Sequence, residues 1–161
     1  MRDQYAGDVS DFLKYALLRQ LAGEGRRRLG VAWYYGPGHD GGPDGRHLEW
    51  QHDDDWAAFD PELHCSLKAL PERSLAALEE RDFWPTGTLF HREPVPGSFG
   101  YRRQWLTHMQ AALRAANLVF LDPDTGLGPP SRKHAILDEL AALREEGRAL
   151  VFITFPARKA H

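Results

Sequence analysis

Hydrophobic residues along the chain follow two spacings, one typical of helices and one typical of buried strands. Between Val9 and Leu21, apolar side chains recur every three or four positions, which predicts an amphipathic helix. Continuous apolar runs at 29–35, 118–121 and 149–155 predict strands instead, and the last two have the pattern of strands buried on both faces. Strands of that kind belong to parallel sheets covered by helices, so the pattern favours an α/β fold.

The order of the remaining elements supports this interpretation. The second half of the chain alternates helix and strand, which favours parallel strands joined by crossover helices. We therefore expect an α/β, Rossmann-like, mostly parallel sheet with flanking helices, in a single domain over residues 1–161 that could lack its C-terminal strands. Bare sheet edges would favour a homo-oligomer. The further expected elements are strands at 47–50 and around 89–91, and helices at 61–70, 74–81, 105–116 and 136–143.

Composition and charge narrow the function classes. The 161 residues are 42% hydrophobic and 27% charged, with a formal net charge of −3, which is typical of globular proteins and gives no bulk attraction to nucleic acid or an anionic membrane. The sequence shows no signal peptide and no apolar run long enough to span a membrane, so we expect a cytoplasmic protein. Cys65, the single cysteine, allows no internal disulfide and is expected to be buried in a helix.

The strand at 118–121 runs directly into Asp122-Pro123-Asp124-Thr125-Gly126. Proline and glycine end the strand, and open α/β sheets bind ligands beyond the carboxyl ends of their strands. Asp122 and Asp124 are therefore candidate catalytic residues, able to accept a hydrogen bond from an amino group or to act as a base. The alternative is a turn in which both side chains satisfy nearby backbone N–H groups.

Two other segments are candidates for ligand binding. The glycine-rich loop 36–45 follows a predicted strand, and its glycines allow close approach of a ligand, although it matches neither the dinucleotide fingerprint nor a phosphate-binding loop. On the first helix, Asp11 and Lys14 lie one turn apart and could cover a cofactor pocket; the alternative is a surface ion pair on a packing helix. Histidines and aspartates between His39 and Asp55 match no metal-ligand spacing, so we expect no metal site there.

These residues suggest a family. Ala6-Gly7-Asp8, Asp11-Phe12-Leu13-Lys14, the glycine-rich loop and Leu121-Asp122-Pro123 together resemble class I S-adenosylmethionine-dependent methyltransferases, and are nearest in motif order to bacterial ribosomal-RNA adenine-N6 methyltransferases. Asp-Pro-Asp-Thr stands where that family carries Asp-Pro-Pro-Tyr. The resemblance implies a methyltransferase that uses S-adenosylmethionine and acts on an amine of a nucleic acid or small molecule. In that case Asp122 would bind the acceptor nitrogen, and the residues near the cofactor would be Lys14, Gly36, Gly38 and Glu49, with Glu49 as the candidate acid for binding the ribose.

Two other functions stay open at the level of sequence. Asp122 and Asp124 could serve a metal-dependent phosphatase or nuclease, because Asp-x-Asp occurs as a nucleophile motif in phosphatases. The chain could also be a non-catalytic Rossmann-like binding module.

Overall fold

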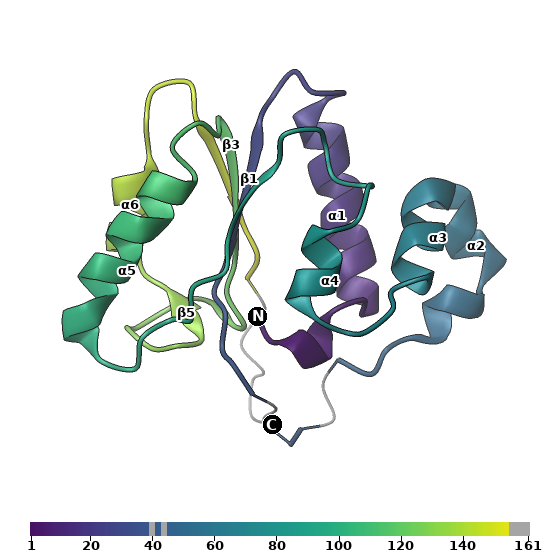
Figure 1. The fold of residues 1–161 in the computed structure, drawn as a ribbon, viewed down its shortest axis with the longest axis horizontal. Coiled ribbons are helices and arrows are strands. Elements are labelled where there is room, and N and C mark those ends of the chain that lie inside the picture. Colours follow the sequence, from purple (N-terminus) through teal and green to yellow (C-terminus); the bar gives the residue numbers. More distant parts are fainter. Residues whose placement is uncertain (39–40, 43–44, 155–161) are drawn as a thin grey trace, which may run out of the picture. The chain divides into compact units, whose positions relative to one another are not determined.

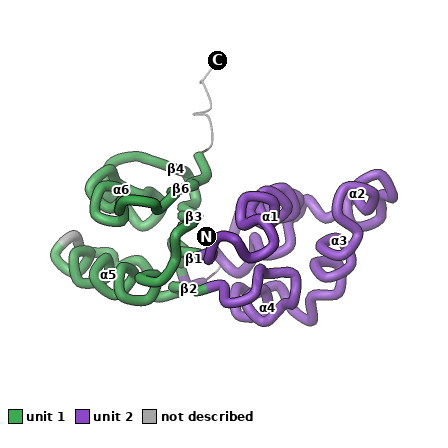
Figure 2. The backbone as a smooth tube through the Cα atoms, turned by 90° about the horizontal axis from the view of Figure 1, so that it is seen from above, with its two compact units in different colours: residues 1, 30–36, 89–161 green, residues 2–29, 37–88 purple. Residues whose placement is uncertain are grey.

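The computed structural model describes residues 1–38, 41–42 and 45–154. Expectations for His39, Asp40, Asp44 and Phe155 lie outside these residues. The chain divides into two compact units, coloured separately in Figure 2. We call residues 1, 30–36 and 89–161 the sheet unit, and residues 2–29 and 37–88 the helical unit.

The sheet unit contains a four-stranded parallel sheet with the order β2-β1-β3-β6, which confirms the expected Rossmann-like α/β fold. The direction in which successive strands are added reverses between β1 and β3. Strand β2 lies on one side of β1, whereas β3 lies on the other side with β6 beyond it. This place between β1 and β3 is the topological switch point, where such folds bind ligands. The strands are β1 (Leu29–Trp33), β2 (Leu89–His91), β3 (Leu118–Asp122) and β6 (Ala149–Phe152).

Helices α5 (Phe99–Ala112) and α6 (Leu137–Leu143) cover one face of this sheet (Figure 1). A short parallel pair, β4 (Gly126–Leu127) with β5 (His134–Ala135), lies between β3 and α6. Alternate residues of β1 and β3 enter the core on this face, since successive side chains of a strand point to opposite sides. The core combines Ala32, Tyr34, Val119 and Leu121 with Trp105, Met109, Leu113 and Leu143.

The helical unit begins with the turn η1 (Asp3–Tyr5) and helix α1 (Val9–Ala22). Asp8 caps α1 by accepting from the Ser10 N–H, and Gly23 ends the helix in the left-handed conformation that glycine adopts readily. An aromatic cluster packs Phe12 against Trp50, with ring centroids 5.0 Å apart. The other elements are η2 (Glu49–His52), α2 (Asp54–Phe59), α3 (Pro61–Lys68) and α4 (Leu75–Glu79).

Several expectations were wrong in detail. Residues 47–50 form no strand; η2 begins at Glu49, because Trp50 is buried in the aromatic cluster instead of pairing with a sheet. Cys65 is exposed on α3. Strand β6 is not buried on both faces, and Phe152 is 37% exposed, because in the described part of the chain β6 pairs on one side only, with β3. Helix α5 begins at Phe99, six residues earlier than expected.

Candidate functional site

The two predicted catalytic carboxylates lie at the switch point. Asp122 is the last residue of β3 and is 3% exposed, and Pro123 ends the strand. The Asp124 side chain is 9% exposed. Gly36 follows β1, the neighbouring strand in the same unit. The strands that lead to these residues are adjacent, whereas the roles of the residues stay predictions.

A nitrogen donor occupies the space between the ends of these strands. The Met1 amino group donates to the Tyr34 carbonyl at 2.7 Å and to the Asp122 carbonyl at 3.4 Å, and it forms an ion pair with the Asp124 carboxylate. The Gly36 N–H in turn donates to the Met1 carbonyl at 2.9 Å. Met1 is only 3% exposed. Three oxygen acceptors at or just beyond the ends of β1 and β3 thus contact one amine, and we call this arrangement the amine site.

The loop that carries Asp124 is held by the β4–β5 pair. The Thr125 N–H donates to the Lys133 carbonyl at 3.1 Å, and its hydroxyl donates to the same oxygen at 2.9 Å. Gly128 donates its N–H to the Ala135 carbonyl at 3.1 Å. The Asp124 carboxylate forms an ion pair with the Met1 amine, a contact that the alternative of a purely local turn does not include.

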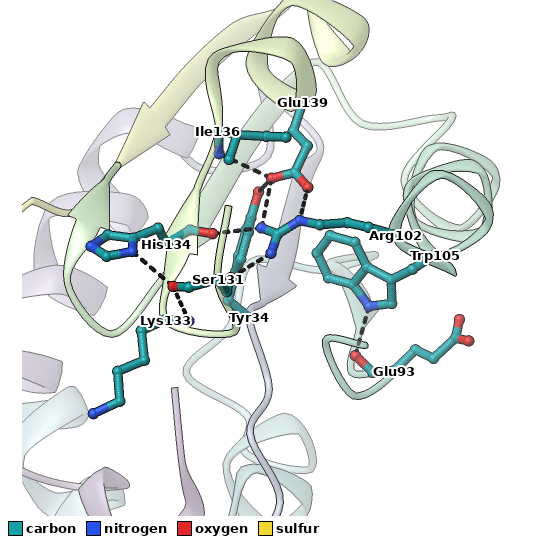
Figure 3. Close-up of polar contacts among 9 residues, drawn as sticks. All are labelled: Tyr34, Glu93, Arg102, Trp105, Ser131, Lys133, His134, Ile136 and Glu139. Carbon is teal, nitrogen blue, oxygen red and sulfur yellow. Dashed lines mark hydrogen bonds and ion pairs between the residues drawn. The ribbon is translucent and has the colours of Figure 1, made fainter. Parts of the chain in front are cut away.

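A buried ion pair joins Arg102 to Glu139 in the sheet unit, and Figure 3 shows its hydrogen bonds. Arg102 from α5 donates its Nε to Glu139 of α6 at 2.6 Å, and the Glu139 carboxylate also accepts from the Tyr34 hydroxyl at 2.9 Å and from the Ile136 N–H at 3.1 Å. The remaining guanidinium nitrogens of Arg102 donate to the carbonyls of Ser131 and His134. Glu139 is 1% exposed and Arg102 4% exposed.

This environment fixes the protonation of Tyr34. Burial raises the pKa of the Tyr34 hydroxyl, and the Glu139 carboxylate raises it further by repelling negative charge and accepting the hydroxyl hydrogen bond. Tyr34 therefore keeps its proton over the physiological range and acts as a permanent donor to Glu139. No local sequence pattern indicates this network, because its partners lie 37 and 105 residues apart.

A second group of polar side chains follows β2, the other neighbour of β1. Glu93 accepts a hydrogen bond from the His108 ring at 2.8 Å and lies 3.6 Å from the ring of His91, beyond hydrogen-bond length. Trp105 donates its indole N–H to the Glu93 carbonyl at 2.9 Å. A cavity of about 150 Å³ opens beside Glu93, and it is lined by Glu93, Pro94, Pro96, Tyr101, Gln104 and Trp105.

His91 makes stability depend on pH. The side chain is 6% exposed, and among the described residues neither ring nitrogen has a hydrogen-bond partner. Burial lowers the pKa of His91, while the Glu93 carboxylate acts in the opposite direction. The unfolded chain therefore binds this proton more readily than the folded chain, so protonation at low pH favours unfolding. Below the unfolded-state pKa of about 6.5 we expect the free energy of unfolding to fall.

We expect His91→Phe to reduce this loss of stability, because the substitution removes the proton-binding group and keeps an aromatic ring beside Trp105. Urea unfolding at several pH values between about 7.5 and 5 measures the effect. His52→Gln, at an exposed position on η2, is the control and should keep the wild-type pH dependence. Identical pH profiles for His91→Phe and the wild type would contradict the assignment.

The predicted cofactor residues divide between the two units. Lys14, Gly38 and Glu49 belong to the helical unit, whereas Gly36 belongs to the sheet unit. Lys14 Nζ forms an ion pair with the Asp11 carboxylate at 2.6 Å, and both side chains are buried, so the surface ion pair offered as the alternative is not present. Asp11 also accepts the Gly7 N–H at 2.9 Å, which fixes the turn that precedes α1. Glu49 is the first residue of η2.

Among the described residues, no three or more His, Cys, Asp or Glu side chains are placed to hold a metal ion. No helix of the described ranges is long and apolar enough to cross a membrane. Comparisons of the chain with protein-family models, curated proteins and solved structures found no match.

Proposed function

We propose that the protein is an S-adenosylmethionine-dependent methyltransferase-like enzyme whose acceptor is an amine of a nucleic acid or small molecule. The observation that supports this most is the amine site, where the Tyr34 carbonyl, the Asp122 carbonyl and the Asp124 carboxylate surround a nitrogen donor. The Met1 amine serves here as a stand-in for the amino group of an acceptor. The Met1 ammonium has three N–H bonds, whereas a neutral acceptor amine has two N–H bonds and a lone pair. Hydrogen bonds from those two N–H bonds to the carbonyls would orient the lone pair toward a methyl donor.

Two features beyond the ends of β1 and β2 support this choice of cofactor. Gly36 follows β1, and Glu93 follows β2 with a 44% exposed side chain. An accessible carboxylate can accept hydrogen bonds from ribose hydroxyls, and the adjoining cavity offers the aromatic rings of Tyr101 and Trp105. We therefore prefer Glu93 to Glu49 as the ribose-binding acid. The role of Lys14, which belongs to the helical unit, stays a prediction from the resemblance.

The chain's contribution to catalysis would be positioning and proton removal. When bound, the cofactor supplies a methyl group on a positively charged sulfur. Tyr34 and Asp122 would hold the acceptor nitrogen through their carbonyls, while the Asp124 carboxylate would favour the positive charge that develops on this nitrogen as the new N–C bond forms. Asp124 could then accept the proton that the methylated amine releases.

Asp124→Asn tests this proposal. The substitution keeps the shape of the side chain and removes its charge, so we expect binding of S-adenosylmethionine to persist and methyl transfer to fall about 100-fold. Calorimetry with S-adenosylmethionine and its demethylated product measures binding. Transfer of a labelled methyl group to total RNA and to a panel of small amines measures activity. Asp138→Asn, an exposed carboxylate on α6, is the control and should match the wild type.

A non-catalytic binding module is the second candidate, favoured by one observation. The position proposed for the acceptor amine is held by the chain's own Met1. Failure of the folded wild-type protein to bind either cofactor form would reject the methyltransferase and favour this module. Cofactor binding together with equal transfer by Asp124→Asn and the wild type would instead reject the role given to Asp124.

A further inference from the structure

We propose that Arg102 and Glu139 are positioning residues that set the separation between the two sides of the amine site. The ion pair connects to both sides through different contacts, and those contacts come from α5 and α6 rather than from the strands that carry the site (Figure 3). The inference rests on the proposed function only in taking an amine as the ligand; the positioning itself can be measured without any ligand.

The first side of the site is fixed through Tyr34. Its carbonyl accepts from the Met1 amine at 2.7 Å, while its hydroxyl donates to Glu139 at 2.9 Å. Tyr34 is fully buried, and it is fixed both at its backbone carbonyl and at its hydroxyl group. Movement of Glu139 would therefore shift the ring, and with it the carbonyl that contacts the amine.

The second side is fixed through the β4–β5 pair. Arg102 donates to the carbonyls of Ser131 and His134, which flank the segment paired with the loop after β3. Within that segment, Lys133 accepts from Thr125, the residue immediately after Asp124. The planar guanidinium binds Glu139 and this segment at the same time, a geometry that lysine cannot reproduce.

These residues act through others rather than at the site itself. Among the described residues, Arg102 and Glu139 form hydrogen bonds with one another and with Tyr34, Ile136, Ser131 and His134, and the Arg102 guanidinium lies over the Trp105 ring. Stability alone does not explain such a pair, because well-packed apolar residues often stabilise a core equally well. The fixed directions of several charge-assisted hydrogen bonds are what an apolar replacement would lose.

Hydrogen exchange in Arg102→Lys tests this inference. We expect amide exchange at Thr125 and Gly128 to accelerate by about tenfold, because the segment that accepts their hydrogen bonds loses the hydrogen bonds from Arg102 to Ser131 and His134. Arg148→Lys is the matched control: Arg148 has a 4% exposed side chain and donates to the carbonyls of Ala116, Leu143 and Arg114 at 2.9–3.0 Å. It should leave both amides at wild-type rates. Unchanged exchange in Arg102→Lys, or equal acceleration in both variants, would overturn the inference.

A second variant covers the case in which Arg102→Lys fails to fold. Tyr34→Phe removes a single hydrogen bond, and we expect faster exchange of the Gly36 amide, which donates to Met1. Unchanged exchange at Gly36 would then overturn the inference. In the methyl-transfer assay, either variant should raise the KM for the acceptor without weakening cofactor binding. Absence of cofactor binding in the wild type would reject the proposed function and leave the exchange results to decide the positioning role.

Discussion

Glu139→Gln is expected to lower the free energy of unfolding by about 3–5 kcal/mol, because it removes one partner of a buried ion pair and leaves Arg102 charged. Glu139 accepts from Arg102, Tyr34 and the Ile136 N–H, and it is 1% exposed. A glutamine has one acceptor oxygen in place of two, so its NH₂ group, which is itself a donor, would face donors that the Glu139 carboxylate now accepts from. Urea unfolding followed by tryptophan fluorescence measures the change.

Glu145→Gln is the control for this prediction. Glu145 pairs with Arg148 at 3.1 Å but is 61% exposed, and exposed ion pairs stabilise proteins by about 0–1 kcal/mol. The double variant Arg102→Met, Glu139→Leu should be more stable than Glu139→Gln, because no uncompensated charge stays in the core. A loss below about 1 kcal/mol in Glu139→Gln would show that the buried pair contributes little to stability.

The fold was predictable from local sequence where apolar runs were long. Strands β1 and β3 were predicted correctly because all five residues of each strand are buried, which produces a largely apolar run in the sequence. The abrupt end of the run in β3 also indicated the position of Asp122. Strand β6 was located but its burial was overestimated, because a sequence run does not show how many neighbours a strand has. The strand predicted at residues 47–50 was wrong because the segment is short, and its conformation depends on the burial of Trp50 against Phe12.

The site was predictable only in part, because its contacts connect distant residues. Helix α6 illustrates this: Leu137 is 71% exposed, whereas Glu139 is 1% exposed, the reverse of what hydropathy predicts. The charge on Glu139 is compensated by Arg102, 37 residues away, and no local spacing encodes that pairing. The contact between Met1 and Asp124 is likewise invisible to periodicity, since a terminal residue has no pattern around it.

The loop after Asp124 also depends on a glycine that no side chain can replace. Gly126 has a φ of +98°, and a Cβ atom placed there would lie 2.8 Å from the Cα of Thr154. Gly147 has a similar φ of +77°, but nothing lies within 4 Å of its Cβ position. A side chain at either position would be strained by the positive φ, and only at Gly126 would it also approach another segment of backbone closely.

Gly126→Ala is therefore expected to lower the free energy of unfolding by about 2–4 kcal/mol, and Gly147→Ala by about 1 kcal/mol. Urea unfolding of both variants measures the difference, which isolates the contribution of the close approach to Thr154. Equal losses would show that the backbone at Thr154 moves aside at little cost. Because Gly126 lies two residues after Asp124, a shift of the loop would also move the carboxylate away from the Tyr34 carbonyl. In the methyl-transfer assay that tests the proposed function, Gly126→Ala should thus lose activity even at temperatures where it stays folded, whereas Gly147→Ala should behave as the wild type.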